Sequence, residues 1–206
     1  MDVQVATTIL LVRHGQTNAN ATGFYMGWSD EDLNELGYTQ ARRLSVRLAS
    51  LPIASVYTTP LRRAYTTAAI LAEPHKLELQ VLDDLTEIRL GDWQGLHMDG
   101  IQQRWPELWR QSRSDPSELT MPNGESYWQV TERAVRIFKM VIEANRGKQA
   151  VIVTHEVIVK VLLAHVLGVS NSIYRRIEVD NASLSLIRVS NNSQLVKLND
   201  TSHLES

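Results

Sequence analysis

The chain has 206 residues, 43% of them hydrophobic, which predicts one globular domain with a substantial core. A net charge of −2, from 21 basic and 23 acidic residues, gives no overall field for binding nucleic acid or an anionic membrane. The absence of cysteine excludes disulfides, thiolate metal sites and cysteine nucleophiles.

The first half of the chain alternates strand and helix patterns. A helix is predicted over Asp32–Leu51, where leucines recur near helical spacing before a proline. Thr59 suits an N-cap and Pro60 suits the first position of a second helix, which should run to about Glu73. Short apolar strands are predicted at Thr8–Val12, Ala54–Thr58 and Leu77–Leu82.

The second half begins with a less regular region, from Arg89 to about Asn123, and we treat residues 89–126 as an irregular insertion. Its aromatic residues either line a pocket or pack in the core, and we weigh the two equally; they are Trp93, Trp105, Trp109, Tyr127 and Trp128. Helices are predicted over Gly124–Asn145 and from His155 to about Gly168, and strands at Ala150–Thr154, Ser183–Val189 and Gln194–Leu198.

This alternation predicts an α/β fold: a single-domain, three-layer sandwich with a mainly parallel central sheet flanked by helices. In such sheets, ligands bind outside the carboxyl ends of the strands. His14, Thr59 and His155 each follow a predicted strand directly. We therefore expect these three positions to converge at one edge of the sheet.

The segment with the most chemistry is Leu11-Val12-Arg13-His14-Gly15-Gln16-Thr17. A ring nitrogen beside a cation suits attack on an anionic phosphate, and the glycine lets the backbone approach a ligand closely. Three further segments stand out along the chain: Thr59-Pro60-Leu61-Arg62-Arg63-Ala64, Leu85-Thr86-Glu87-Ile88 and Val153-Thr154-His155.

In this order, the four segments resemble the motifs of the histidine phosphatase superfamily, also called the phosphoglycerate mutase-like family. The resemblance runs from Ile9 to about Ser185, which is most of the chain. It implies the sandwich fold predicted above. It also implies hydrolysis of a small-molecule phosphate ester through a phosphohistidine, with no cofactor and no metal ion.

The resemblance assigns a role to each motif residue. His14 is the nucleophile, whose attacking nitrogen must be unprotonated. Arg13 and Arg63 clamp the phosphoryl oxygens, because the guanidinium fork forms paired hydrogen bonds with phosphate. His155 completes the charged pocket. Glu87 protonates the leaving oxygen, since a carboxyl near a phosphate dianion can hold a proton.

Neighbouring residues offer alternatives to these assignments. Arg62 competes with Arg63, but it is expected to be a more exposed neighbour. Asp84 is an alternative proton donor, and Asp92 is a weaker one. Among the other histidines, His165 is expected to be structural, and no role is assigned to His75, His97 and His203.

Small polar residues follow the first motif. Gln16, Thr17 and Asn20 are predicted to bind substrate, with Asn20 donating to a phosphoryl oxygen. Their alternative role is turn formation and helix capping, which such residues perform widely. The late segment Asn181-Ala182-Ser183 resembles a family segment near the site.

Two positions depart from the family pattern. Glu156 follows the second histidine, where the family commonly has glycine, and Thr66 stands where glutamine is frequent. An inward carboxylate would repel phosphate by roughly 1 kcal/mol at 4 Å in water and by several times more in a partly buried site. Glu156 therefore points away, selects substrates that carry a cationic group, or lowers activity.

We consider three functions. The first is a metal-independent phosphomonoesterase, since the short stretch between Glu87 and His155 is typical of the compact phosphatase branch. The second is a cofactor-dependent phosphoglycerate mutase, and the third is a non-catalytic phosphate-binding protein. Candidate substrates are sugar phosphates, phosphoserine, a cobalamin-precursor phosphate and nucleotides. The amino terminus lacks signal-peptide features, so we expect a cytoplasmic protein, and we also consider a homodimer.

Overall fold

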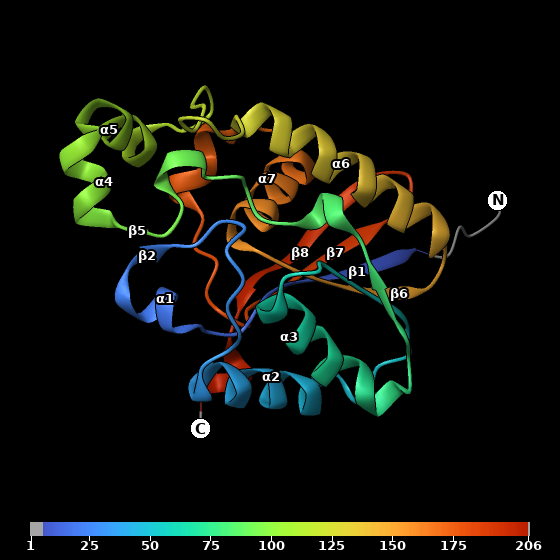
Figure 1. Ribbon diagram of the computed structural model, residues 1–206. Coiled ribbons are helices and arrows are strands. Elements are labelled where there is room, and N and C mark those ends of the chain that lie inside the picture. Colours follow the sequence, from blue (N-terminus) through green and yellow to red (C-terminus); the bar gives the residue numbers. More distant parts are fainter. Residues whose placement is uncertain (1–5, 206) are drawn as a thin grey trace.

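A six-stranded sheet forms the middle layer of the fold, with the strand order β4-β3-β6-β1-β7-β8 (Figure 1). The computed structural model describes residues 6–205. The strands of this sheet are β1 (Thr7–Arg13), β3 (Ile53–Thr58), β4 (Leu79–Val81), β6 (Gln149–Thr154), β7 (Leu184–Val189) and β8 (Ser193–Asp200). Pairing is parallel from β4 through β1, and β7 and β8 add an antiparallel edge. The predicted mainly parallel sheet is confirmed.

Helices cover both faces of the sheet (Figure 1). One layer contains α2 (Glu35–Leu48) and α3 (Arg62–Ala72), and the other contains α6 (Tyr127–Ala144) and α7 (Glu156–Leu167). Strand β1 faces both layers, because side chains alternate along a strand. Its Ile9 and Leu11 join the core beneath α6 and α7, whereas Leu10 and Val12 join the core beneath α2 and α3. Burial on both faces explains the continuous apolar pattern of this strand.

Three predicted helix starts are wrong. Helix α6 begins at Tyr127 rather than Gly124, because the Ser126 side chain caps it by accepting a hydrogen bond from the Gln129 amide at 3.2 Å. Helix α2 begins at Glu35 rather than Asp32, because the Asn34 side chain accepts a hydrogen bond from the Gly37 amide at 2.8 Å. Helix α3 begins at Arg62, so Thr59 is not its N-cap and Pro60 lies outside it. Acceptors from a distant loop serve its first amides: the Asp30 carboxylate for Arg62 and the Glu31 carbonyl for Arg63.

The region predicted to be irregular, residues 89–126, contains two helices, α4 (Met98–Arg104) and α5 (Pro106–Ser114). Strand β5 (Leu96–His97) precedes them and pairs with β2 (Phe24–Tyr25), which follows the short helix α1 (Asn18–Thr22). Aromatic contacts join these pieces, because the Trp93 ring lies 6.2 Å from Tyr25 and 6.3 Å from Trp109, between centroids. Trp93 is only 1% exposed, so this tryptophan packs in the core, whereas Trp128 is 66% exposed.

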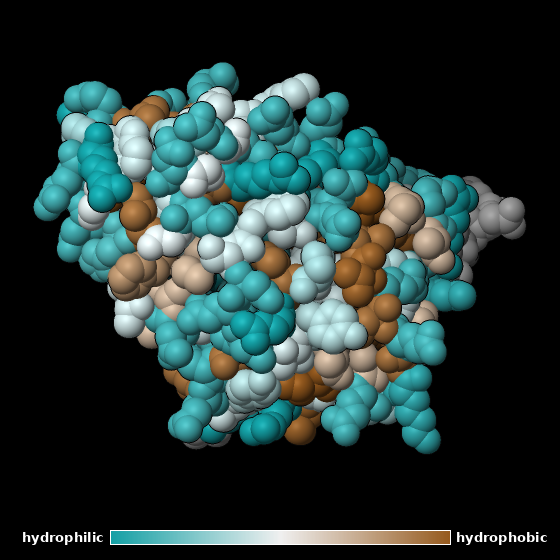
Figure 2. Space-filling model, viewed as in Figure 1, coloured by the Kyte–Doolittle hydropathy of each residue, from teal (hydrophilic) through white to brown (hydrophobic). Residues whose placement is uncertain are grey.

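The surface seen in Figure 2 is mainly hydrophilic, with a narrow hydrophobic strip past the edge strand β4, between α6 and α3. Val81 of this strand is 45% exposed. Within residues 6–205, no helix combines the length and apolar character needed to cross a membrane.

Candidate active site

The carboxyl ends of three parallel strands bring the predicted residues together, as expected for ligand sites in such sheets. His14 follows β1, Thr59 comes directly after β3, and His155 follows β6. The rings of His14 and His155 lie 5.2 Å apart between centroids. Both are buried, with 4% and 0% of their surfaces exposed. Two imidazoles far apart in the sequence therefore form one buried pair.

Backbone contacts fix the tautomer of His14. Its Nδ1 lies 2.7 Å from the Gly15 carbonyl oxygen, which can only accept, so Nδ1 carries the ring proton. The Nε2 atom is then the unprotonated one. Burial lowers the pKa of His14 well below its usual value, and the charges of Arg63 and Arg13 lower it further. The ring is neutral and nucleophilic near neutral pH.

Gly15 is required by packing rather than by ligand approach. A Cβ atom there would lie 2.6 Å from the Gly37 carbonyl oxygen, so the start of α2 could not approach the loop. The Gly15 amide donates to the Thr67 hydroxyl at 3.1 Å, and that hydroxyl donates to the Arg63 carbonyl at 2.7 Å. Helices α2 and α3 thus clamp the backbone that carries His14.

The two ring nitrogens of His155 differ in their hydrogen-bond contacts. Its Nε2 lies 3.0 Å from the Thr59 hydroxyl. Its buried Nδ1 has no hydrogen-bond partner among the residues that the structure describes. Burial lowers the pKa of His155 well below its usual value, and nearby Arg63 adds to this effect. When the hydroxyl of Thr59 donates to Nε2, Nδ1 carries a proton that an anion can accept.

The two predicted arginine clamps are held by main-chain carbonyls. Arg63, 3% exposed, donates to the carbonyls of Gly27 and Ser29 at 2.6 and 2.9 Å. Arg13 donates to the Val179 carbonyl, and its buried Nε has no partner within the described part of the chain. Arg62, in contrast, is exposed and pairs with Asp30 at the surface. This agrees with the prediction that Arg62 is the more exposed neighbour of Arg63.

Glu87 lies beside the start of α7. Its carboxylate accepts from the amides of Ile88 at 3.0 Å and Val157 at 3.4 Å. Burial nevertheless raises the pKa of Glu87, and the nearby carboxylate of Glu156 raises it further. A carboxyl with a raised pKa can hold a proton for a leaving group. The alternative donors have other partners, because Asp84 pairs with Arg136 and Asp92 accepts from Asn123.

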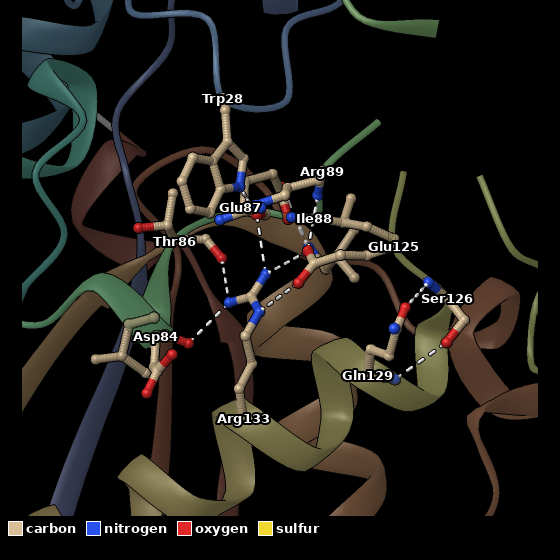
Figure 3. Close-up of polar contacts among 12 residues, drawn as sticks. Trp28, Asp84, Thr86, Glu87, Ile88, Arg89, Glu125, Ser126, Gln129 and Arg133 are labelled. Carbon is tan, nitrogen blue, oxygen red and sulfur yellow. Dashed lines mark hydrogen bonds and ion pairs between the residues drawn. The ribbon is translucent and has the colours of Figure 1, made fainter. Parts of the chain in front are cut away.

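Arg133 of α6 fixes the segment that carries Glu87, and the sequence analysis did not identify it (Figure 3). Its guanidinium donates to the carbonyls of Asp84, Thr86 and Glu87 at 2.7, 2.6 and 3.0 Å. It also pairs with Glu125 at 2.9 Å, and both side chains are largely buried, at 11% and 16% exposed. No local motif marks this arginine, because its partners lie far away in the sequence.

The polar residues after His14 divide into two groups. Gln16 is tied to α2, where its amide oxygen accepts from Asn34 at 2.9 Å, and it does not line the pocket. Thr17 and Asn20 form the capping box of α1, yet both line the pocket. The Asn181 amide donates to the His14 carbonyl and to Asn20, each at 3.1 Å. The segment Asn181-Ala182-Ser183 therefore lies against the loop that carries His14.

Glu156 faces the pocket, so the alternative in which it points away is wrong. Its carboxylate lies 3.2 Å from Arg13 and 2.7 Å from Lys160, and its side chain is 32% exposed. Burial alone would raise the pKa of Glu156, but Arg13 and then Lys160 hold it below its usual value. An ionised carboxylate therefore stands beside one of the two predicted phosphate clamps.

The site borders a cavity of about 420 Å³, whose lining includes Arg13, Arg63, Glu87, Asn20, Glu156 and Tyr174, while the rings of His14 and His155 lie buried behind this wall. Within residues 6–205, no group of three histidine or acidic side chains is arranged to hold a metal ion. Buried nitrogens without partners and guanidinium groups at this edge of a parallel sheet suit a phosphate group. The fold and the site thus define an α/β protein that handles phosphate esters.

Comparison with known proteins extends this class to a family. The sequence profile of the histidine phosphatase superfamily (branch 1) matches residues 9–201. Phosphoserine phosphatase 1 of Hydrogenobacter thermophilus is 32% identical over 197 residues, which cover 95% of this chain and 93% of that protein. The metal-independent phosphoserine phosphatase of Arabidopsis thaliana is 32% identical over 100% of this chain and 87% of its own.

Two solved structures have the same fold as this chain. YhfR of Bacillus stearothermophilus superposes with a TM-score of 0.92 at 30% identity, over 96% of this chain and 99% of its own. The mycobacterial glucosyl-3-phosphoglycerate phosphatase Rv2419c gives a TM-score of 0.87 at 28% identity, over 94% of this chain and 99% of its own. The chain belongs to the histidine phosphatase superfamily, and it is a phosphomonoesterase for small phosphorylated metabolites.

Proposed function

We propose that this chain hydrolyses its phosphomonoester without a metal ion, through a phosphohistidine on Nε2 of His14. The observation that carries the proposal is the hydrogen bond from Nδ1 to the Gly15 carbonyl, which leaves Nε2 with its lone pair. Arg13 and Arg63 are the two charges that act most strongly on this ring. A neutral nucleophile between two cations suits attack on a phosphate dianion.

In the first step, the Nε2 lone pair forms a bond to phosphorus and the bond from phosphorus to the ester oxygen breaks. The leaving oxygen keeps the electron pair and takes the proton held by Glu87. Arg13, Arg63 and Nδ1 of His155 supply donors to the phosphoryl oxygens. Thr17 and Asn20 lie on the wall of the same pocket and complete the set of polar groups.

In the second step, water attacks phosphorus and gives one proton to the Glu87 carboxylate. The bond between nitrogen and phosphorus breaks, its electron pair returns to Nε2, and inorganic phosphate leaves. Glu87 then holds a proton for the next cycle, as general acid–base catalysis requires. The two relatives compared above both carry the name phosphoserine phosphatase, and the one from Arabidopsis thaliana is described as metal-independent. Both names support hydrolysis rather than mutase activity.

The test uses an aryl phosphate with protein that has been treated with a chelator. We expect the wild type to keep its turnover, and His14→Ala to lose at least about 1,000-fold, as the removal of a covalent nucleophile does. His165→Ala is the matched control, because this histidine of α7 is exposed at the surface, whereas His14 is buried. Undiminished turnover in His14→Ala would show that His14 is not the nucleophile.

The mutase alternative is tested with 3-phosphoglycerate. We expect release of inorganic phosphate to be faster than formation of 2-phosphoglycerate. Rapid isomerisation primed by 2,3-bisphosphoglycerate would favour the mutase instead. A cytoplasmic location and a homodimer stay predictions from the sequence.

A further inference from the structure

The pocket contains a second pair of arginines beyond the phosphate clamps. Arg113 comes from α5, and Arg175 comes from the short helix η4 (Asn171–Arg176) that follows α7. These segments lie far apart in the sequence but meet in space, since Arg175 Nε donates to the Ser112 carbonyl at 2.7 Å. We call Arg113 and Arg175 the distal arginines.

The distal arginines lie at a different part of the pocket from the phosphate clamps. The charges that act on His14 are those of Arg63 and Arg13. The charges that act most strongly on the hydroxyl of Tyr25, in contrast, are those of Arg175 and Arg113. Tyr25 also lines the cavity, so the same space has positive charge at two separate places.

Neither distal arginine has a carboxylate partner within ion-pairing distance in the described part of the chain. Their contacts are instead with neutral groups: Arg175 donates to the Ser112 carbonyl, Arg113 has the Tyr25 hydroxyl as a hydrogen-bond partner, and both guanidinium groups lie over aromatic faces. The Arg175 guanidinium carbon lies 5.2 Å from the Tyr174 ring centroid, and that of Arg113 lies 5.6 Å from the Trp109 ring centroid. Stacking of this kind orients a guanidinium and leaves its edge donors available to a planar anion.

The side chains that line the cavity carry more positive than negative charge, and a bound substrate would have to balance this excess. Four arginines and two glutamates line the cavity. Glu87 holds a proton in the proposed resting state, and Glu156 is offset by Lys160, whose Nζ lies 2.7 Å from its carboxylate. A phosphate dianion offsets the charges of Arg13 and Arg63. Glu156 also interacts with Arg175, but Arg13 and Lys160 act on it more strongly, so the distal arginines keep an excess of positive charge. In a partly enclosed site, such charges interact more strongly than in water.

We propose that Arg175 and Arg113 bind a carboxylate of the substrate, so that the preferred substrate is a phosphomonoester of a small hydroxy acid or amino acid. This inference rests on the phosphatase function proposed above. The two acids share the carboxylate and differ at the neighbouring carbon. An ammonium group there would have Glu156 on the pocket wall as its partner, and a hydroxyl group would not need that charge.

The test is a panel of four substrates compared by kcat/KM. O-Phosphoserine and 3-phosphoglycerate carry a carboxylate, whereas phosphoethanolamine and glycerol 3-phosphate do not. We expect the wild type to prefer the carboxylate pair by roughly 10- to 100-fold, the scale of a hydrogen-bonded ion contact. Within that pair, faster turnover of O-phosphoserine indicates an amino acid ester, and faster turnover of 3-phosphoglycerate indicates a hydroxy acid ester.

For the variants, the measured quantity is the ratio of kcat/KM between the substrates with and without a carboxylate. We expect Arg175→Ala to reduce the ratio between the two substrate pairs to about one, and Arg113→Ala to reduce it in part. Arg176→Ala is the matched control, because this exposed neighbour does not line the pocket and should leave the ratio unchanged. Equal efficiencies in the wild type, or a ratio that both distal variants preserve, would overturn the proposal. Failure of the phosphatase function would look different, because none of the four substrates would release phosphate.

Discussion

At the phosphate end of the pocket, His14, Arg63 and His155 are at most 4% exposed, and each has a polar contact to a backbone carbonyl or a buried hydroxyl. At the distal end, Arg113 is exposed on a two-turn helix and Arg175 is partly buried, held by one carbonyl and one ring. The two histidines directly follow strands and Arg63 stands in the first turn of α3, whereas the distal arginines stand on peripheral segments.

This difference indicates that the residues for phosphoryl transfer and the residues for substrate selection stand on different parts of the fold. Groups that transfer a phosphoryl group need fixed geometry, which the ends of packed strands provide. Groups that select a substrate can stand on surface segments, which tolerate change without loss of the core. Substitutions at the phosphate end should therefore alter the rate of the chemical step, and substitutions at the distal end should alter the choice of substrate.

The largest expected effect within this comparison concerns the proton donor. Glu87→Gln keeps the shape of the side chain but cannot supply a proton. We expect kcat for an alkyl phosphate to fall by roughly 100- to 10,000-fold, the range of general acid catalysis. An aryl phosphate with a good leaving group should lose much less in the bond-breaking step. Equal losses for both substrates would contradict the role of Glu87.

The pH profile provides an internal check on the same variant. Because the pKa of Glu87 is raised, the acid form persists above the usual range of a carboxyl, and alkyl phosphate turnover should fall as pH rises through that value. Because the pKa of His14 is lowered, turnover should persist into acidic solution and fall below that value. In Glu87→Gln the alkaline fall should be absent.

The next effect concerns Arg133, which positions Glu87 without contacting substrate. Arg133→Lys keeps the charge but cannot reach three carbonyls and a carboxylate at once. We expect alkyl phosphate turnover to fall by roughly 10- to 100-fold, the cost of a displaced catalytic group, with a smaller loss for an aryl phosphate. Arg136→Lys, at the exposed pair with Asp84, is the matched control. A purely structural role would reduce both substrates equally.

The smallest effect concerns Glu156, the carboxylate beside Arg13. Glu156→Gln removes a negative charge while keeping a group that can accept a hydrogen bond from Arg13. We expect inorganic phosphate to inhibit roughly two- to tenfold more strongly, because a partly exposed charge pair contributes on the order of 1 kcal/mol. The exposed Glu178→Gln serves as the control. Weaker inhibition would show that Glu156 supports phosphate binding rather than opposing it.

Much of the phosphate end could be predicted from the sequence, because its residues stand in short motifs next to buried strands. An apolar run followed by His14 or His155 encodes both the strand and the position of the imidazole at its end. The local pattern was misleading at Thr59, whose hydroxyl contacts His155 while a distant Asp30 takes over the capping of α3. Capping preferences describe neighbours in sequence and do not register such long-range competition.

The distal end could not be predicted in the same way. Arg113 and Arg175 belong to no motif, and their meeting depends on the contact between α5 and η4. Arg133 was overlooked for the same reason, since its partners come from segments about 8 to 49 positions away. A buried arginine in an otherwise amphipathic helix is ambiguous in sequence, because an exposed arginine gives the same pattern.

The central claim, a phosphoryl group carried on Nε2 of His14, is tested most directly by trapping it. Glu87→Gln should accumulate the intermediate from an aryl phosphate, because bond breaking proceeds while the attack of water lacks its base. After an alkaline quench, which preserves phosphohistidine, peptide mass spectrometry locates the group. We predict one phosphoryl group per chain, on the peptide that contains His14. Full turnover with an unmodified His14, or a phosphoryl group on another residue, would contradict the account.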